Sequence, residues 1–167
     1  MQNSAKPQKR QPIYRNDVKE PLDWTAVVHD LRKDQFMTAA RKIFEAESIL
    51  AKMERSEKIG SESVSFLGVI HDVFSHLLDE YSIKFGCSAD RIGLEKFKAK
   101  AKKTGNLNAI NFLIWYEKEY KKLRDNPEFG HLLDKEMPTG TEGDIVRTCS
   151  NLLKETKSVV FYAYENF

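Results

Sequence analysis

The stretch that decides the fold is IVRTCSNLLKETKSVVFYA, residues 145–163. Its apolar and small side chains recur at intervals of one, three and four residues: Ile145, Cys149, Leu152, Leu153, Thr156, Val159, Val160 and Ala163. Because a helix completes a turn about every 3.6 residues, this spacing predicts an amphipathic helix with one buried face. Thr141, followed three residues later by Asp144, has the pattern of a capping box, so the helix should begin there.

Two segments upstream have the same periodicity. The first is predicted to run from an N-cap at Asp23 to a stop at Gly60. Its apolar residues are Val27, Val28, Leu31, Met37, Ala40, Ile43, Phe44 and Leu50. The second should begin at Ser61 or Ser63 and end at Gly86. Its expected buried residues are Phe66, Leu67, Ile70, Val73, Phe74, Leu77, Leu78 and Tyr81.

Three further helical segments are expected between residues 88 and 134. Ser88 or Asp90 should open a helix that closes at residues 104–106. The next is predicted from about Leu107 to Arg124, and its expected buried residues are Leu107, Ile110, Phe112, Leu113, Tyr116 and Tyr120. Residues 126–128, Asn-Pro-Glu, have the chemistry of a helix start, so a short helix should follow. It would carry Phe129, Leu132 and Leu133.

Length and composition indicate one domain built from these helices. The chain has 167 residues, and only eight glycines and five prolines are available for turns. No run of β-branched residues alternates with polar residues as strands do. We therefore predict an all-α fold, a mostly antiparallel bundle of four or five helices over residues 21–167.

The start of the chain differs from the rest in charge. Residues 1–16 contain Lys6, Lys9, Arg10 and Arg15 and no acid, whereas the whole chain has a net charge of +2. Such a segment buries too little apolar surface to fold, so residues 1–20 are predicted to form a flexible basic arm. This start lacks the apolar core of a signal peptide. The sequence has no stretch of about 18 apolar residues, so no membrane span is predicted.

The residues that could bind a metal or a cofactor do not form a recognisable pattern. Cys87 and Cys149 are not spaced as in a disulfide scaffold, so a reducing cytoplasm is the expected compartment. His71 and His76 lie five residues apart on a helix, whereas paired ligands usually lie three or four apart. No glycine-rich phosphate loop is present. We predict no cofactor and no metal, while a metal-binding bundle that uses the two histidines stays open as a third hypothesis.

The strongest basic clustering lies in the expected third and fourth helices. Lys96, Lys100 and Lys103 fall on one helical face. Lys118, Lys121 and Lys122 follow in the next helix. If the two helices pack together, these lysines could contact an RNA backbone. The alternative interpretation is a solvated helix face that serves solubility.

The segment Leu123–His131 reads LRDNPEFGH and separates an arginine, Arg124, from a histidine, His131, by six residues. Asp125, a polar residue, follows the arginine directly. This pattern resembles the R-x(4–6)-H motif of HEPN domains, small all-α modules found in ribonucleases of toxin, defence and RNA-processing systems. The position of the motif, after a long helix and before the last one, is also similar.

The resemblance implies a metal-independent endoribonuclease that acts on RNA. His131 would move protons, Arg124 would stabilise negative charge on the phosphate, and Asp125 would orient one of them. HEPN-like proteins are commonly homodimers, so a homodimer is implied as well. An excess of aromatic residues beyond what the core can bury supports the same prediction: Trp115, Tyr116, Tyr120, Phe161, Tyr162, Tyr164 and Phe167. The alternative function, of a different class, is a non-catalytic interaction module, such as an immunity or adaptor protein with a protein partner.

Overall fold

The computed structural model of the chain describes residues 38–134 and 140–167. Within these residues the fold is all-α, and no strand is present. The elements are α2 (Thr38–Glu54), α3 (Ile59–Lys84), α4 (Leu94–Thr104), α5 (Leu107–Arg124), the 3₁₀ helix η3 (Gly130–Asp134) and α6 (Glu142–Asn166). The predicted fold class is confirmed. The predictions for the basic arm and for the helix start at Asp23 lie outside the described residues.

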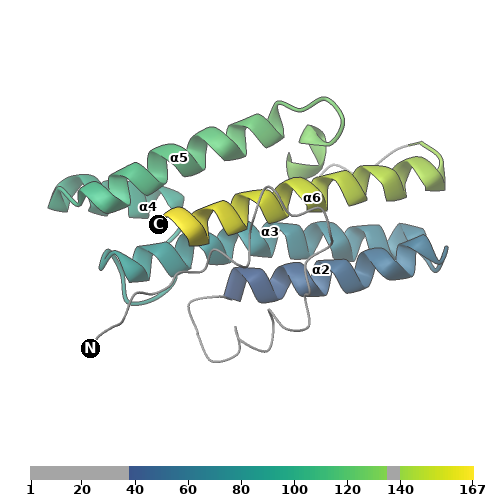
Figure 1. The fold of residues 1–167 in the computed structure, drawn as a ribbon, viewed down its shortest axis with the longest axis horizontal. Coiled ribbons are helices and arrows are strands. Elements are labelled where there is room, and N and C mark those ends of the chain that lie inside the picture. Colours follow the sequence, from purple (N-terminus) through teal and green to yellow (C-terminus); the bar gives the residue numbers. More distant parts are fainter. Residues whose placement is uncertain (1–37, 135–139) are drawn as a thin grey trace, which may run out of the picture.

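The four long helices run in alternating directions, as Figure 1 shows. α2 and α3 form an antiparallel pair, α6 lies along them, and α5 lies on the far side of α6 from α2. α4 is a short helix within the connection between α3 and α5. The arrangement is the mostly antiparallel bundle that the periodicity predicts.

α3 lies at the centre of the bundle because its apolar face extends over most of its length. Its predicted stripe, from Phe66 to Tyr81, is buried at every position. Tyr81 joins three helices: its ring stacks on Phe112 of α5 at 4.4 Å between centroids, and its hydroxyl donates a 2.7 Å hydrogen bond to the Ala163 carbonyl oxygen of α6. Polar and apolar contacts of one residue therefore hold α5 and α6 against α3.

α6 begins where the sequence predicts. The Thr141 hydroxyl accepts a hydrogen bond from the Asp144 N–H, and the Asp144 carboxylate accepts one from the Thr141 N–H, both at 3.1 Å. This capping box satisfies amide groups that have no partner inside the helix. Of the predicted stripe, all residues from Cys149 to Ala163 are buried, and Ile145 is partly buried.

The predicted boundary at Gly60 is wrong. α2 ends at Glu54, and α3 begins at Ile59, so Gly60 lies inside α3 and not between the helices. The chain reverses because Ser56 and Lys58 both adopt positive φ values, 61° and 45°. Neither residue type marks a left-handed turn as glycine would, so the sequence pattern favours a break at the nearest glycine.

The predicted start of the third helix at Ser88 or Asp90 is also wrong. α4 begins at Leu94, after Gly93, whose φ of 79° interrupts the helical path. A tertiary contact holds the preceding loop: the Asp79 carboxylate accepts a 3.2 Å hydrogen bond from the Ile92 N–H and pairs with Arg91 at 3.3 Å. The loop is thus fixed by α3 and does not continue as helix.

The short helix predicted from Asn126 begins later. The Asn126 side chain accepts a hydrogen bond from the Glu128 N–H, which forms a turn, and the 3₁₀ helix starts only at Gly130. Its expected core residues Phe129, Leu132 and Leu133 are buried. Upstream, Leu107, which is expected to be buried, is exposed by 71%, and Phe44, one of the apolar residues of the first predicted helix, is exposed by 39%.

The aromatic residues cited for a homodimer mostly pack within one chain. Phe161 and Tyr116 are buried, Trp115, Tyr120, Tyr164 and Phe167 pack partly buried against the core, and Tyr162 is exposed by 41%. The premise that the core cannot hold them is therefore wrong, and the dimer itself stays a prediction.

Among residues 38–134 and 140–167, no helix combines the length and the apolar character that a membrane crossing requires.

Candidate functional site

Arg124 is the last residue of α5, and its guanidinium group contacts η3. Its Nη2 atom lies 2.8 Å from the Asp134 Oδ1 atom, and both side chains are about half exposed, at 49% and 51%. A cation at the C-terminus of a helix interacts favourably with the helix dipole. The ion pair therefore joins the end of α5 to the 3₁₀ helix that carries His131.

Among the described residues, the Asp125 side chain forms no hydrogen bond or ion pair with Arg124 or His131, the two residues of which it is predicted to orient one. It follows α5 directly, and its Oδ2 atom pairs with the Lys121 Nζ atom one turn earlier, at 2.5 Å. Both side chains are exposed. In this arrangement Asp125 neutralises a lysine of the predicted RNA-binding set.

His131 lies in η3, seven residues after Arg124, and its side chain is partly exposed. The loop that follows α5 separates the two residues. Within the described residues, no hydrogen bond or ion pair joins its imidazole to Arg124 or to Asp125. The intervening turn is tight, because the Gly130 N–H donates a 2.7 Å hydrogen bond to the Asn126 carbonyl oxygen. A Cβ atom at Gly130 would lie 2.0 Å from the Arg124 carbonyl oxygen. The structure thus places the two motif residues at one turn, without a bond between them.

The predicted lysines of α4 are exposed. Among the described residues, Lys96, Lys100 and Lys103 have no acidic partner within ion-pair distance. Lys98, which lies outside the set selected from the sequence, connects α4 to α5 through a 2.9 Å contact with Glu117. The hydrogen bond from Lys98 to Glu117 raises the pKa of Lys98. Lys98 therefore joins α4 to α5 through an ion pair.

The lysines of α5 divide into paired and unpaired groups. Lys122 pairs with Glu119 at 3.4 Å, and Lys121 pairs with Asp125. Lys118 is exposed and has no acidic partner in the described part of the chain.

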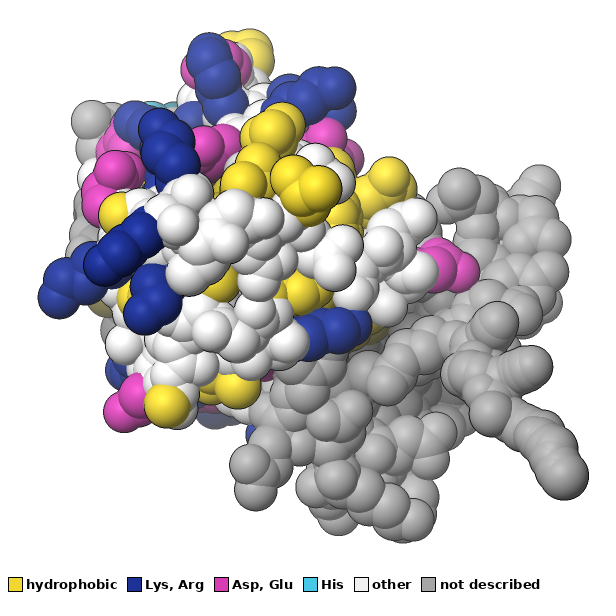
Figure 2. Space-filling model, turned by 90° about the vertical axis from the view of Figure 1, so that its left-hand side faces the viewer, with side chains coloured by type: hydrophobic (Ala, Val, Ile, Leu, Met, Phe, Trp, Pro, Cys, Tyr) yellow, Lys and Arg dark blue, Asp and Glu magenta, His cyan; other side chains and the backbone are white. Residues whose placement is uncertain are grey.

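Residues 94–125 carry nine Lys or Arg and four Asp or Glu, although the whole chain has a net charge of only +2. Figure 2 shows the end of the molecule that holds α4 and the start of α5, where Lys and Arg side chains gather at one edge and at the top.

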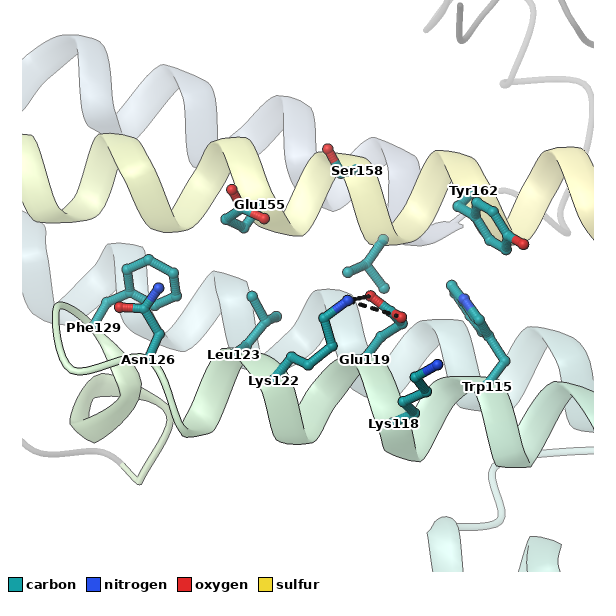
Figure 3. Close-up of a pocket in the computed structure, with 11 residues that line it drawn as sticks. Trp115, Lys118, Glu119, Lys122, Leu123, Asn126, Phe129, Glu155, Ser158 and Tyr162 are labelled. Atoms are coloured by element: carbon teal, nitrogen blue, oxygen red, sulfur yellow. Dashed lines mark hydrogen bonds and ion pairs between the residues drawn. The ribbon is translucent and has the colours of Figure 1, made fainter. Parts of the chain in front are cut away.

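A groove between α5 and α6 is a feature that the sequence does not predict. It has a volume of about 500 Å³. Figure 3 shows its lining residues: Trp115, Lys118, Glu119, Lys122, Leu123, Asn126, Phe129, Glu155, Ser158, Val159 and Tyr162. The signal that could have found it is the position of Trp115 and Tyr162, which lie beside the buried stripes of their helices. From the sequence alone, that signal favours a dimer surface equally well.

Among the described residues, no group of three or more His, Cys, Asp or Glu could hold a metal ion, so His71 and His76 do not belong to such a group. Burial and the nearby Arg91 lower the pKa of His76.

The chain was compared with models of protein families, with curated proteins and with solved structures, and none of the three comparisons gives a significant match.

Proposed function

We propose that this protein binds RNA through the hairpin of α4 and α5, residues 94–125. The observation that carries the proposal is the excess of nine basic over four acidic residues in this hairpin. Four of the predicted lysines are exposed and lack an acidic partner among the described residues: Lys96, Lys100, Lys103 and Lys118. Unpaired lysines on adjacent helices bind phosphate groups and release counterions, which favours RNA over a neutral partner.

The finer proposal is that the protein cleaves this RNA without a metal. The resemblance of the Arg124–His131 segment to HEPN ribonucleases supports it, together with the position of that segment at the end of the basic hairpin. The imidazole of His131 would take the proton of a 2′-hydroxyl and return one to the leaving 5′-oxygen. The guanidinium group would stabilise the charge on the five-coordinate phosphate.

The ion pair between Arg124 and Asp134 does not prevent this role. Both groups are about half exposed, and an exposed ion pair contributes only about 0–1 kcal/mol. An RNA phosphate offers the guanidinium group two oxygen atoms as a bidentate partner, so it can compete with the Asp134 carboxylate.

The binding proposal is tested by the salt dependence of RNA affinity. Lys96→Gln/Lys100→Gln should weaken binding and reduce the slope of log K against log salt by about 0.7 for each phosphate that the variant no longer neutralises. The matched control is Lys52→Gln/Lys154→Gln, since both lysines are exposed on other helices. Equal slopes for the two double variants, or no RNA binding by the wild type, would contradict the proposal.

The cleavage proposal is tested by incubating the protein with mixed RNA in excess EDTA and looking for 2′,3′-cyclic phosphate ends. Arg124→Ala and His131→Ala should each abolish these products while RNA binding is retained. Cleavage that persists in both variants excludes these residues as the catalytic pair. If the wild type yields no products, the cleavage proposal is wrong, and the binding test alone decides whether the protein binds RNA.

A second candidate function, a protein interaction module, is favoured by the outer face of α5. Leu107 and Ile114 lie two turns apart on this helix and are exposed by 71% and 62%. Apolar side chains at this spacing suit a helix of a protein partner or a second copy of the chain. The predicted homodimer would use this face rather than the buried aromatic residues.

Light scattering at about 100 µM, well above usual dimer Kd values, tests the homodimer. We expect a dimer for the wild type and a monomer for Ile114→Lys. Val64→Lys, at an apolar position of α3 exposed by 53%, is the control and should leave the dimer intact. A monomeric wild type would exclude self-association through this face.

We also propose a cytoplasmic location, since Cys87 and Cys149 are both free thiols.

A further inference from the structure

The groove between α5 and α6 has an aromatic end. The rings of Trp115 and Tyr162 stack there with centroids 5.2 Å apart and an angle of 18° between their planes. Phe167 packs against Trp115 from another side, at 5.3 Å. Tyr162 remains exposed by 41% although it is part of this stack. The groove therefore presents a supported, partly exposed ring against which a flat ligand can pack.

A free cation lies at the same end. Figure 3 shows Lys118 next to Trp115, while Lys122 points toward Glu119, with which it forms an ion pair. Lys118 has no such partner in the described residues, so its charge is available to a ligand. An aromatic ring with an unpaired lysine beside it matches the two parts of a nucleotide, a base that stacks and a phosphate.

The other end of the groove offers polar groups. Asn126 and Glu155 line it, as Figure 3 shows, and the Asn126 Oδ1 atom accepts a hydrogen bond from the Glu128 N–H. The amide NH₂ group of Asn126 remains as a donor. The carboxylate of Glu155 can accept a hydrogen bond from an amino group of a base.

The groove has the size and the position that a nucleotide needs. Its volume of about 500 Å³ lies within the range of small-ligand pockets. Asn126 and Phe129, which line the polar end, belong to the turn between Arg124 and His131. A strand that occupies the groove would consequently extend toward these two residues.

We propose that this groove holds one nucleotide of a single-stranded RNA, with its base packed against Tyr162 and its phosphate at Lys118. The proposal rests on the proposed RNA-binding function and assigns it a site. In this proposal, Tyr162 and Lys118 both contact the RNA. Lys118 belongs to the lysines predicted from the sequence, whereas Tyr162 is a new RNA-contacting residue.

The test uses the full chain in a Trp24→Phe background, so that Trp115 is the remaining tryptophan. The probes are a fluorescein-labelled single-stranded RNA octamer, whose affinity is measured by anisotropy, and the same octamer without label, whose effect on Trp115 emission is recorded. We expect the RNA to quench Trp115 emission, because a base would pack against the Trp115–Tyr162 stack. Tyr162→Leu should weaken binding about tenfold, as expected when one base no longer stacks on an aromatic ring.

Phe44→Leu is the matched control, because Phe44 is exposed to a similar degree, 39%, and lies on α2. It should leave the affinity unchanged. Lys118→Gln alters only an exposed side chain, so it tests the groove even if Tyr162→Leu impairs folding. It should weaken binding and reduce the salt slope.

The outcomes separate the two proposals. If the wild type binds no RNA, the proposed function falls, and the groove proposal falls with it. If the wild type binds RNA and Lys96→Gln/Lys100→Gln weakens the binding, the proposed function stands. Unchanged Trp115 emission together with unchanged affinity in Lys118→Gln would then overturn the groove proposal alone. Quenching by adenosine monophosphate as strong as that by the octamer would assign the groove to free nucleotides and overturn the role in strand binding.

Discussion

A single carboxyl group, that of Glu80, holds the first turn of α2. Its Oε2 atom accepts a 2.6 Å hydrogen bond from the Ala39 N–H, and its Oε1 atom accepts one from the Tyr164 hydroxyl at 2.9 Å. Glu80 is only 6% exposed. Burial raises its pKa to about 8, against the opposing effect of these hydrogen bonds and of Arg41.

The raised pKa predicts a pH dependence of stability. The folded state binds the proton of Glu80 more tightly than the unfolded state, whose pKa is 4.5. This contribution to the free energy of unfolding is therefore fully present below pH 4.5 and is lost as the pH rises toward 8, by at most about 1.4 kcal/mol per pH unit. Urea unfolding of the wild type and of Glu80→Gln at several pH values measures it. A difference between the two proteins that does not change with pH would contradict the prediction.

Close packing at Gly130 means that a side chain at this position would disturb the candidate site. A Cβ atom at this position would lie 2.0 Å from the Arg124 carbonyl oxygen. Gly130→Ala must therefore shift η3 away from α5, and we expect it to lower the free energy of unfolding by about 1–3 kcal/mol. Gly68→Ala is the control, because a Cβ atom there meets nothing within 4 Å. Since Gly68 lies inside α3, this variant should be slightly more stable than the wild type. Thermal unfolding of both variants checks the prediction, and equal losses would refute it.

At the scale of the elements, the capping box of α6 carries a measurable share of stability. Thr141→Ala removes the acceptor for the Asp144 N–H and should cost about 1 kcal/mol. Thr148→Ala, at a position inside α6, is the control and should have a much smaller effect. Denaturant unfolding with circular dichroism measures both, and a loss of equal size in the two variants would show that the cap has no special role.

The elements that could be predicted from the sequence are those with local signals. α5 and the start of α6 match the predicted bounds, since Asn106 and Thr141 cap amides only three residues away. The α2–α3 turn and the start of α4 could not be predicted. The first depends on left-handed backbone at Ser56 and Lys58, and the second on the contact of Asp79 with residues of the loop. Such contacts depend on tertiary packing, which periodicity does not encode.

The candidate site was predictable only in part, for the same reason. The motif pattern identifies Arg124 and His131, and the charge pattern identifies the α4 lysines. The sequence could not show that Asp134 pairs with Arg124 or that Lys121 pairs with Asp125. The groove depends on the pairing of Trp115 with Tyr162, which come from helices far apart in the sequence.

At the scale of the whole molecule, the described bundle should unfold as one unit. α5 touches the core through Phe112, which stacks on Tyr81, and the Tyr81 hydroxyl also bonds to α6. In the Trp24→Phe background, Trp115 fluorescence reports the α5–α6 groove, while circular dichroism reports all helices. We expect the two thermal transitions to coincide. A fluorescence transition at lower temperature would mean that the α4–α5 hairpin detaches first.

The hydrogen bonds at the start of α2 also determine when this helix can be completed during synthesis. The Ala40 N–H donates a hydrogen bond to the hydroxyl of Tyr164, which lies 124 positions later in the chain. The Ala39 N–H donates a hydrogen bond to the carboxyl group of Glu80, which lies 41 positions later. The ribosome therefore releases α2 long before α6 exists to hold it. Until Tyr164 has been translated, the first turn of α2 lacks part of its native support, and a nascent chain stalled before α6 should remain open to proteases and chaperones at that turn.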